Sequence, residues 1–577
     1  MTQIPALLGR LKNEALIPLI LCVSCTFIAG CSAKRYQAAA DRESYRILQQ
    51  KQLAALGKTN QFSIDTRYSH RSPQDIKPGE IIEDRLSKIS RVITLPEALE
   101  TAFTNSRQYQ LRKETLYLSA LTLTRERFNF TPQFFAGSTL RGTRSSSGEQ
   151  SGAVNSSGGM DAALKTGGRV SLDIANDLLR FYTGDPRRSA VSTISLSLVQ
   201  PLLRGAGAKI AAENLTQAER EVIYEIRGFA YYQHTFSFDI VSTYLRLLQQ
   251  QDTVRNQYAN YQSRISLRER TEALAFDRLA PFQADQAKQE ELSARNSYIL
   301  AIERYRNSLD DFKVTLGIPV GEEIKLDENA LKELEAVGLL PVPLMEPQAF
   351  QIAIDHRPDM LNEIDRFEDS KRKIPVAASA LKTDLRLFGD VSLSSERPTD
   401  YANFNLNDYQ ASGGIQLNLP INRKLERNSY RSSIISFERQ LRNFALFLDN
   451  LKNDVRSDLR TLDQSRQSYE IQNSAKALAD RRVESSELSL QAGRVQVRDV
   501  VDAQTSRVQA YNATTAALVD YHLTRLRLLL DIGLLKTEQT KFWLLPGDLP
   551  KPDAGTTPTA PPSAADALPS PEKLFEK

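Results

Sequence analysis

The stretch SLSLVQPLLRGAG, residues 195–207, joins two kinds of sequence. Residues 193–198 alternate between hydroxyl and apolar side chains, a period of two that is typical of a β-strand with one apolar face. Pro201 ends this strand where no ladder hydrogen bond is lost, and Gly205 and Gly207 allow the chain to bend. A long segment with little glycine or proline follows. The stretch therefore predicts a corner between a sheet and a long helix.

The segment after this corner has the period of an α-helix. Between residues 215 and 247, apolar side chains recur at steps of three or four. The pattern predicts a helix from about Leu203 to Leu279, on the order of 110 Å long. Pro281 interrupts it, and a second helix runs to Leu316 before a glycine and a proline end it. Helices of this length favour a coiled-coil rod or a helical barrel over a globular domain.

The same plan occurs twice along the chain, which predicts an internal two-fold repeat. Residues 277–287 align without gaps on residues 493–503, at an offset of 216 positions. Three further pairs keep the same order with drifting offsets: Gly317 with Gly533, Gln200-Pro201 with Leu419-Pro420, and 96–98 with 347–349. Pro420 would end the last strand of the second half as Pro201 ends that of the first.

Four segments have the alternation of strands: 132–142, 191–200, 384–394 and 412–420. After residue 30 no apolar run approaches 18 residues, so a chain that spans a membrane must do so with strands. Helices on one side of a membrane require an even number of strands in each half. Residues 160–176 are interpreted as a hairpin that extends a loop, and the alternative is two further strands.

Composition and motifs exclude several classes of function. The chain has 577 residues, a net charge of +4, 41% hydrophobic and 25% charged residues, which does not indicate a nucleic-acid-binding protein. The four histidines are scattered, and one Cys-x-x-Cys without a second pair predicts no metal site. The sequence has no nucleophile elbow, and no Gly-Lys-Ser/Thr follows the glycines near residue 205. We expect no enzyme activity and no cofactor.

All three cysteines lie at the N-terminus, at Cys22, Cys25 and Cys31. Basic residues, a short apolar core and small residues before Cys31 are typical of a secretory signal peptide. Ile28-Ala29-Gly30-Cys31 resembles a bacterial lipobox, in which the cysteine thiol is lipidated and becomes the mature N-terminus. The alternative is an ordinary signal peptide with an incidental cysteine. By resemblance to proteobacterial lipoproteins, the serine after Cys31 implies the outer membrane.

An ordered set of motifs resembles the TolC family of outer-membrane efflux proteins. The set comprises LPEALETAFTNSRQYQ (95–110), TPQFFAGSTL (131–140), SLSLVQPLLRGAG, DRLAPFQADQA (277–287), TLGIP (315–319) and a second pass from AIDHRPDM (353–360). The resemblance covers about residues 94–535. No single motif is specific, but the order together with the lipobox is.

The resemblance implies a mainly α, mixed α and β channel-tunnel built by a homotrimer. Each subunit would give four strands to a twelve-stranded transmembrane β-barrel in the outer membrane, and its helices would form a periplasmic α-helical barrel. The implied function is an exit duct for a tripartite efflux or type I secretion system. The implied partners are a periplasmic adaptor, an inner-membrane transporter of RND or ABC type, and membrane lipid, with no nucleic acid. The alternative is a lipid-anchored periplasmic coiled-coil scaffold without a pore.

The resemblance also gives a role to the aligned turns at 277–287 and 493–503, which would form the periplasmic tip. Their charged residues could hold the tip shut or contact an adaptor, whereas the simpler interpretation is a solvated helical turn. The candidate residues are Asp277, Arg278, Gln283, Arg494, Arg498 and Asp499. Gln283 stands where the second half has Asp499, so the two turns are not equivalent.

We expect the chain to divide as follows: signal peptide 1–30, N-terminal arm 31–93, first repeat 94–320, linker 321–345, second repeat 346–536 and a disordered Pro/Ala-rich tail 537–577.

Overall fold

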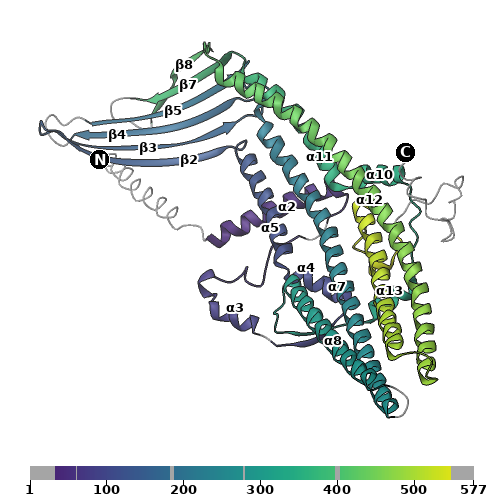
Figure 1. The fold of residues 1–577 in the computed structure, drawn as a ribbon. Coiled ribbons are helices and arrows are strands. Elements are labelled where there is room, and N and C mark those ends of the chain that lie inside the picture. The colour runs from purple at the N-terminus through teal and green to yellow at the C-terminus, as the bar shows by residue number, and fades with distance from the viewer. Residues whose placement is uncertain are drawn as a thin grey trace.

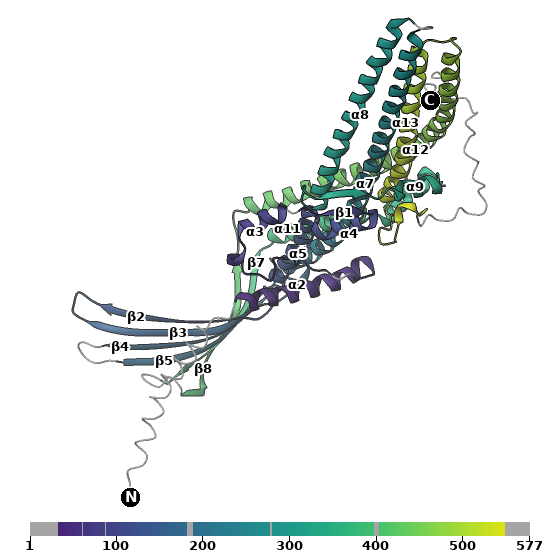
Figure 2. The same ribbon diagram turned by 90° about the horizontal axis from the view of Figure 1, so that it is seen from below.

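The computed structural model describes residues 33–59, 62–86, 88–181, 188–276, 280–396 and 403–547. The molecule is elongated and mainly helical. One large sheet and two long helical hairpins extend in opposite directions from a compact middle (Figures 1 and 2). The expectation of a mainly α, mixed α and β fold is confirmed.

Two sets of helices account for more than half of the described residues. The first set is α4 (Leu95–Asn105), α5 (Arg107–Phe128), α6 (Ala208–Ala211), α7 (Glu213–Ala275) and α8 (Pro281–Leu316). The second set is α10 (Glu346–His356), α11 (Pro358–Ala380), α12 (Lys424–Gln491) and α13 (Val497–Asp531). The 63 residues of α7 and the 68 residues of α12 make helices about 95 and 100 Å long. Each packs against the helix that follows it, α8 or α13.

The large sheet is antiparallel throughout and has the order β2-β3-β4-β5-β7-β8. Its strands are β2 (Gln133–Arg144), β3 (Gln150–Ala163), β4 (Arg169–Phe181), β5 (Arg188–Pro201), β7 (Asp384–Ser395) and β8 (Phe404–Asn418). The four strands expected from the sequence correspond to β2, β5, β7 and β8.

The expectation of four strands in each chain is wrong, because the sheet has six. Residues 160–176 do not extend a loop. Residues 160–163 belong to β3 and 169–176 to β4, two strands that a turn at 164–168 joins and that lie in the sheet between β2 and β5. The signal in β3 is weak because QSGAVNSSGGMDAA is rich in glycine, serine and alanine, which have little intrinsic preference for strands. Pairing along both neighbours compensates for this composition.

The middle of the molecule holds the main hydrophobic core and a small parallel sheet. Strands β1 (Ser90–Ile93) and β6 (Glu323–Leu326) pair there, next to α9 (Asn329–Val337). The buried hydroxyl of Tyr244 on α7 donates a hydrogen bond to the carbonyl of Ile93 at 2.9 Å. The segment expected to be a linker, 321–345, therefore contains a strand and a helix of this core.

The chain stays folded beyond the expected start of the tail at residue 537. Phe542 and Trp543 form a 3-10 helix, η2 (Phe542–Leu544), and both side chains are buried in the main core. The fully buried Arg525 of α13 donates hydrogen bonds to the carbonyls of Trp543 at 2.7 Å and Leu545 at 2.5 Å. The folded chain therefore extends beyond residue 537, where the sequence predicts the disordered tail to begin, and residues 548–577 lie outside the described part.

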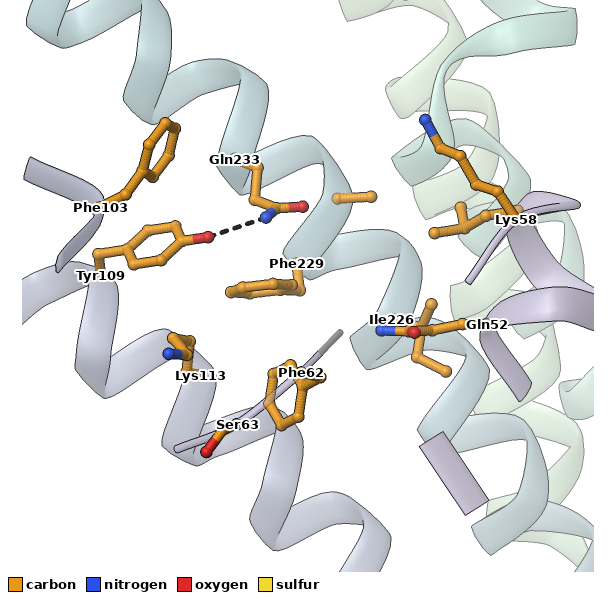
Figure 3. A pocket seen from close by; sticks show the side chains of 12 residues that line it. Gln52, Lys58, Phe62, Ser63, Phe103, Tyr109, Lys113, Ile226, Phe229 and Gln233 are labelled. Atoms are coloured by element: carbon orange, nitrogen blue, oxygen red, sulfur yellow. Dashed lines mark hydrogen bonds between the residues drawn. The ribbon is translucent and has the colours of Figure 1, made fainter. Parts of the chain in front are cut away.

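The N-terminal arm packs along the helical body. Helix α2 (Ala33–Leu56) contacts α5 and α7, and the arm continues through η1 (Pro73–Asp75) and α3 (Pro78–Arg85). Phe62 packs edge-on against Phe229 of α7, with ring centroids 6.1 Å apart. Beside them lies a cavity of about 240 Å³, in which Gln233 donates a hydrogen bond to the Tyr109 hydroxyl at 2.8 Å (Figure 3). The arm is thus part of the folded body.

Candidate functional site

The free ends of the two helical hairpins form the tip of the molecule. Helix α7 ends at Ala275 and α12 ends at Gln491, and residues 277–279 lie outside the described part. Helix α8 begins at Pro281 and α13 begins at Val497, the same 216 positions apart as the aligned sequences. The starts of α8 and α13 therefore occupy corresponding places in the two halves.

Asp499 has a structural role within its own chain. It stands three residues into α13, and its carboxylate accepts a hydrogen bond from the backbone N–H of Gln496 at 3.0 Å. This is a capping box, which satisfies a backbone donor at the start of the helix. In the first half Gln283 takes the corresponding place, and its shielded side-chain oxygen has no hydrogen-bond partner among the described residues. The two hairpins thus begin their second helices differently.

The remaining predicted tip residues are not brought together by the described part of the chain. Arg498 is exposed and lies 3.9 Å from Asp502, one turn further along its own helix. Arg494 is exposed in the turn. Asp277 and Arg278 lie outside the described residues.

The seam between α7 and α13 holds polar contacts that the sequence analysis missed. Arg264 of α7 is 2% exposed and donates hydrogen bonds to the Val501 carbonyl at 2.9 Å and the Thr505 hydroxyl at 2.7 Å. Burial lowers the pKa of Arg264. The buried stripe of α7 at this height is Asn260, Arg264, Leu267 and Thr271, and because only Leu267 is apolar, helical periodicity in the sequence does not indicate that Arg264 is buried.

Two more bonds continue this seam away from the tip. Asn256 donates to Asn512 at 2.9 Å, and Thr515 donates to Asp252 at 2.8 Å. Towards the tip, a small apolar cluster joins all four helices: Leu267, Ala287, Leu490, Val497, Val500 and Val501. Separating the two hairpins requires these contacts to break.

The predicted corner between sheet and helix is present. Pro201 is the last residue of β5, and Gly205 and Gly207 have φ angles of 74° and 96°, which glycine adopts readily. The backbone N–H of Gly205 donates to Ser379 of α11 at 3.1 Å. The N–H of Gly207 donates to the carbonyl of Thr166 at 3.0 Å. The corner is therefore fixed both to a helix and to the turn between β3 and β4.

The second corner is held by a side chain. Pro420 follows β8 by two residues, and Arg423 donates a hydrogen bond to its carbonyl at 3.2 Å. Arg423 also donates to the carbonyl of Leu381, at the end of α11. The strand pattern in the sequence indicates the proline at this corner but not the arginine.

The sheet has one apolar and one polar face, and the separation continues across all six strands. One register row is apolar throughout: Phe134, Met160, Leu172, Leu196, Val391 and Ala411. The next row lies on the opposite face and is polar throughout: Gln133, Asp161, Ser171, Ser197, Asp390 and Ser412. Successive residues of a strand point to opposite faces, so these rows define two surfaces of different character.

One polar row crosses the apolar face, and its members bond to one another. The hydroxyls of Ser138 and Ser156 are 2.8 Å apart. The hydroxyl of Ser192 bonds to Asn176, and its backbone N–H donates to the Ser395 hydroxyl at 2.9 Å. Because these polar groups form hydrogen bonds with one another, the row is compatible with apolar surroundings.

Within the described ranges, no group of three or more His, Cys, Asp or Glu residues is arranged to hold a metal ion. The helices of the same ranges include none that combines the length and the apolar character needed to cross a membrane.

No protein-family model and no curated protein matches this chain. Solved structures do match. The Campylobacter jejuni CmeC outer membrane channel aligns with a TM-score of 0.56 and 13% identity, over 84% of this chain and 91% of that one. The fold is that of the outer-membrane factors. The open state of the Neisseria gonorrhoeae MtrE outer membrane channel aligns with a TM-score of 0.56 and 13% identity, over 76% of this chain and 88% of that one. CusC, whose transmembrane channel formation has been described, aligns with a TM-score of 0.55 and 12% identity, over 76% of this chain and 92% of that one.

The resemblance to the outer-membrane factor fold, expected from the order of motifs, is thus confirmed. The solved neighbours are channel proteins rather than enzymes, in agreement with the expectation that this chain is not an enzyme.

Proposed function

We propose that three copies of this chain form the outer-membrane exit duct of a tripartite efflux or type I secretion system. The duct conducts substrates passively from a periplasmic adaptor and an inner-membrane pump, of RND or ABC type, to the exterior. The observation that carries this proposal is the separation of a mainly apolar from a mainly polar face across six strands, at the end of helices about 100 Å long. A wall between lipid and water needs such a sheet.

The proposal requires more than one copy because the sheet of one chain is open. Its edges are β2 and β8, and most of their residues are exposed. Strands in a bilayer must pair all their backbone groups, so an open edge is not tolerated there. β2 and β8 run in opposite directions within an antiparallel sheet of even strand number, so β8 of one copy can pair antiparallel with β2 of the next.

We also propose that the two halves, 94–320 and 346–536, are an internal duplication. At an offset of 251 positions, α4 and α10 share both bounds, and α5 and α11 share their start and differ by one residue at their end. Gly317, which ends α8, faces the backbone of Asn105, and Gly533, just after α13, faces the backbone of His356. The residue that each glycine faces ends α4 or α10, and these two residues are again 251 positions apart. The duplicated contact supports this interpretation more strongly than sequence alignment does.

We propose further that Cys31, which lies outside the described residues, carries a lipid and becomes the mature N-terminus. Helix α2 begins at Ala33 and packs on the helical body, so an anchor at Cys31 would sit close to folded structure. Most of the mass would then lie in the periplasm, with the tip as the contact for an adaptor and as a gate.

Negative-stain electron microscopy of the detergent-extracted full chain tests the proposal. We expect three-fold cylinders about 130 Å long, from helices of about 100 Å and a bilayer core of about 30 Å. Thin rods or monomeric particles from a folded sample would contradict the duct. They would favour the alternative, a lipid-anchored periplasmic scaffold.

A further inference from the structure

The hairpin β3–β4 is part of the wall of the sheet. Phe134 of β2 pairs with Met160 of β3, Met160 with Leu172 of β4, and Leu172 with Leu196 of β5. Every step is antiparallel and keeps the apolar side chains on one face. A hairpin folded over the sheet, or projecting beyond it, would not continue this register.

The turn of the hairpin is also built into the corner where sheet meets helix. The carbonyl of Thr166 accepts the N–H of Gly207 at 3.0 Å, and its hydroxyl bonds to the side chain of Gln200 at 3.0 Å. A Cβ added at Gly167 would lie 2.6 Å from the carbonyl oxygen of Gly205, so the two backbones are in close contact. The hairpin thus spans the full height of the sheet and ends on the helical body.

We infer that the exit barrel of this protein has eighteen strands, and that its lumen is wide enough for a folded polypeptide segment. The inference rests on the proposed trimeric duct. Six strands per chain in three copies give eighteen, whereas the expected four would give twelve. Barrels of 16–18 strands enclose an aqueous channel.

The width follows from strand spacing and tilt. Strands about 4.8 Å apart and tilted about 40° give a backbone diameter of about 36 Å for eighteen strands, against about 24 Å for twelve. Side chains take about 5 Å on each side, half the spacing of packed sheets. The lumen is then about 25 Å wide rather than about 14 Å. An α-helix is about 10–12 Å across, so two helices pass side by side where a narrower exit admits one.

The helical body of one chain matches this width. Helices α5, α7, α11 and α12 lie side by side below the sheet. Four helices at spacings of 8–10 Å cover an arc of about 32–40 Å. Six tilted strands cover about 38 Å, and four strands only about 25 Å. The added hairpin therefore lets the wall pass from helices to strands without narrowing.

The hairpin also contributes to the polar face. Asp161, Asp173 and Asp177 lie on that face, and Asp161 accepts a hydrogen bond from Ser171 at 2.5 Å. The added strands thus widen a hydrated lumen rather than fill it with apolar side chains. Selection by size would fall to the helical tip.

The first test is electron cryo-microscopy of the full-length protein in detergent, with the strands counted in cross-section. Eighteen strands are expected. A trimer with twelve strands and the hairpin outside the wall would overturn the inference and leave the proposed duct standing. The absence of any trimer or barrel would overturn both.

Cysteine pairs test the same arrangement without altering the fold, because the chain has no cysteine after Cys31. Phe134→Cys with Met160→Cys should form a disulfide on oxidation, since side chains directly opposite each other in antiparallel strands are about 5 Å apart. Phe134→Cys with Leu196→Cys should not, because two strands separate them. The reverse result would exclude the hairpin from the wall.

Deleting residues 150–187, which removes β3 and β4, tests the inferred width of the barrel lumen. The deletion joins β2 to β5 through the turn 145–149 and sets Phe134 opposite Leu198, two residues from its present row, with direction and faces preserved. Ser195→Cys, on the polar face, should react from outside with larger polyethylene-glycol maleimides in the full chain than in the deletion variant. Leu196→Cys, on the apolar face, is the matched control and should stay unreactive in both. Equal size limits for Ser195→Cys in both chains would contradict the wider lumen.

Discussion

Arg264 stands where the α7–α13 seam would accept an apolar side chain, and it uses its charge to connect two helices. Its guanidinium bonds to one carbonyl and one hydroxyl of α13, and one of its nitrogens is buried without a partner among the described residues. The hydrogen bonds of this charge hold the two helices together while the seam is closed. When the seam opens, these bonds are lost and water solvates the guanidinium instead. Arg264 is thus suited to a contact that breaks and forms again.

Arg264→Ala should loosen the tip. The variant loses both hydrogen bonds across the seam, each worth about 1.5–3 kcal/mol for a charged donor, and leaves a void. In planar bilayers we expect a higher conductance or more frequent opening than in the unaltered protein.

Arg268→Ala is the matched control for this prediction. Arg268 bonds to Glu272 and Glu291 within the α7–α8 hairpin, so its loss does not cross the seam. Equal conductance changes in the two variants would show that the seam does not control the tip.

Gly317 should tolerate substitution less well than Gly493. Both have positive φ angles, 78° and 68°. A Cβ at Gly317 would lie 2.1 Å from the carbonyl oxygen of Asn105, whereas at Gly493 no atom lies within 4 Å. Gly493→Ala should lower the free energy of unfolding by about 1–2 kcal/mol, the cost of the left-handed conformation for alanine. Gly317→Ala should lower it by more. Thermal unfolding midpoints compare them, and equal losses would argue against the close contact.

The candidate tip residues illustrate what a sequence can predict at this scale. The alignment of 493–503 on 277–287 makes Asp499 a candidate tip residue. Its role as a helix cap cannot be predicted from that alignment, because it depends on where α13 begins. Arg264 was missed because one arginine in a long helix reads as part of a solvated face. Only the packing of α7 on α13, which are far apart in the sequence, distinguishes a buried arginine from an exposed one.

At the scale of the elements, α12 and α13 bring two carboxyl groups together. Asp458 of α12 lies beside Asp531 at the end of α13, and Arg527 donates a hydrogen bond to Asp531 at 2.8 Å. Burial, and then the charge of Asp531, raise the pKa of Asp458 to about 7. The folded protein therefore holds a proton on Asp458 at pH values where the unfolded chain, with a pKa of about 4, has lost it.

Stability should consequently fall as pH rises from about 4 to about 7, because the folded state binds the extra proton in that window. Asp458→Asn should weaken this fall and should be more stable than the unaltered protein at pH 8, where two adjacent carboxylates repel each other. Thermal unfolding at pH 5 and pH 8, followed by circular dichroism in detergent, measures this. Asp449→Asn, at an exposed site on the same helix, is the control. A parallel pH response in the two variants would refute the role of Asp458.

The long helices and four of the six strands could be predicted because their side chains carry a clear period. β7 and β5 alternate leucine, isoleucine or valine with serine or charged residues. β3 does not, because Gly158 and Gly159 and its serines contribute little apolar contrast between the two faces. Backbone pairing with β2 and β4 determines the place of β3 in the sheet. A local sequence pattern does not reveal such pairing.

At the scale of the whole molecule, the anchor and the sheet make separable contributions to membrane attachment. Cys31→Ser removes the proposed lipid but leaves the sheet intact. We expect the variant to remain with the outer membrane after washing with high salt and alkali, because the apolar face of the sheet still contacts lipid. A soluble variant would favour the scaffold. The mass of the N-terminal peptide of the unaltered protein tests the lipid itself, and an unmodified Cys31 would show that it carries none.

The even number of strands in the hairpin has a consequence for how such a duct can evolve. A single inserted strand would reverse the direction of everything after it, so that the two edge strands would run in the same direction and the antiparallel pairing between copies would be lost. One inserted hairpin preserves direction, facing and closure, and three-fold symmetry multiplies it into six strands at once. In a three-fold duct, one inherited hairpin would therefore change the strand number from twelve to eighteen in a single step, without an intermediate number.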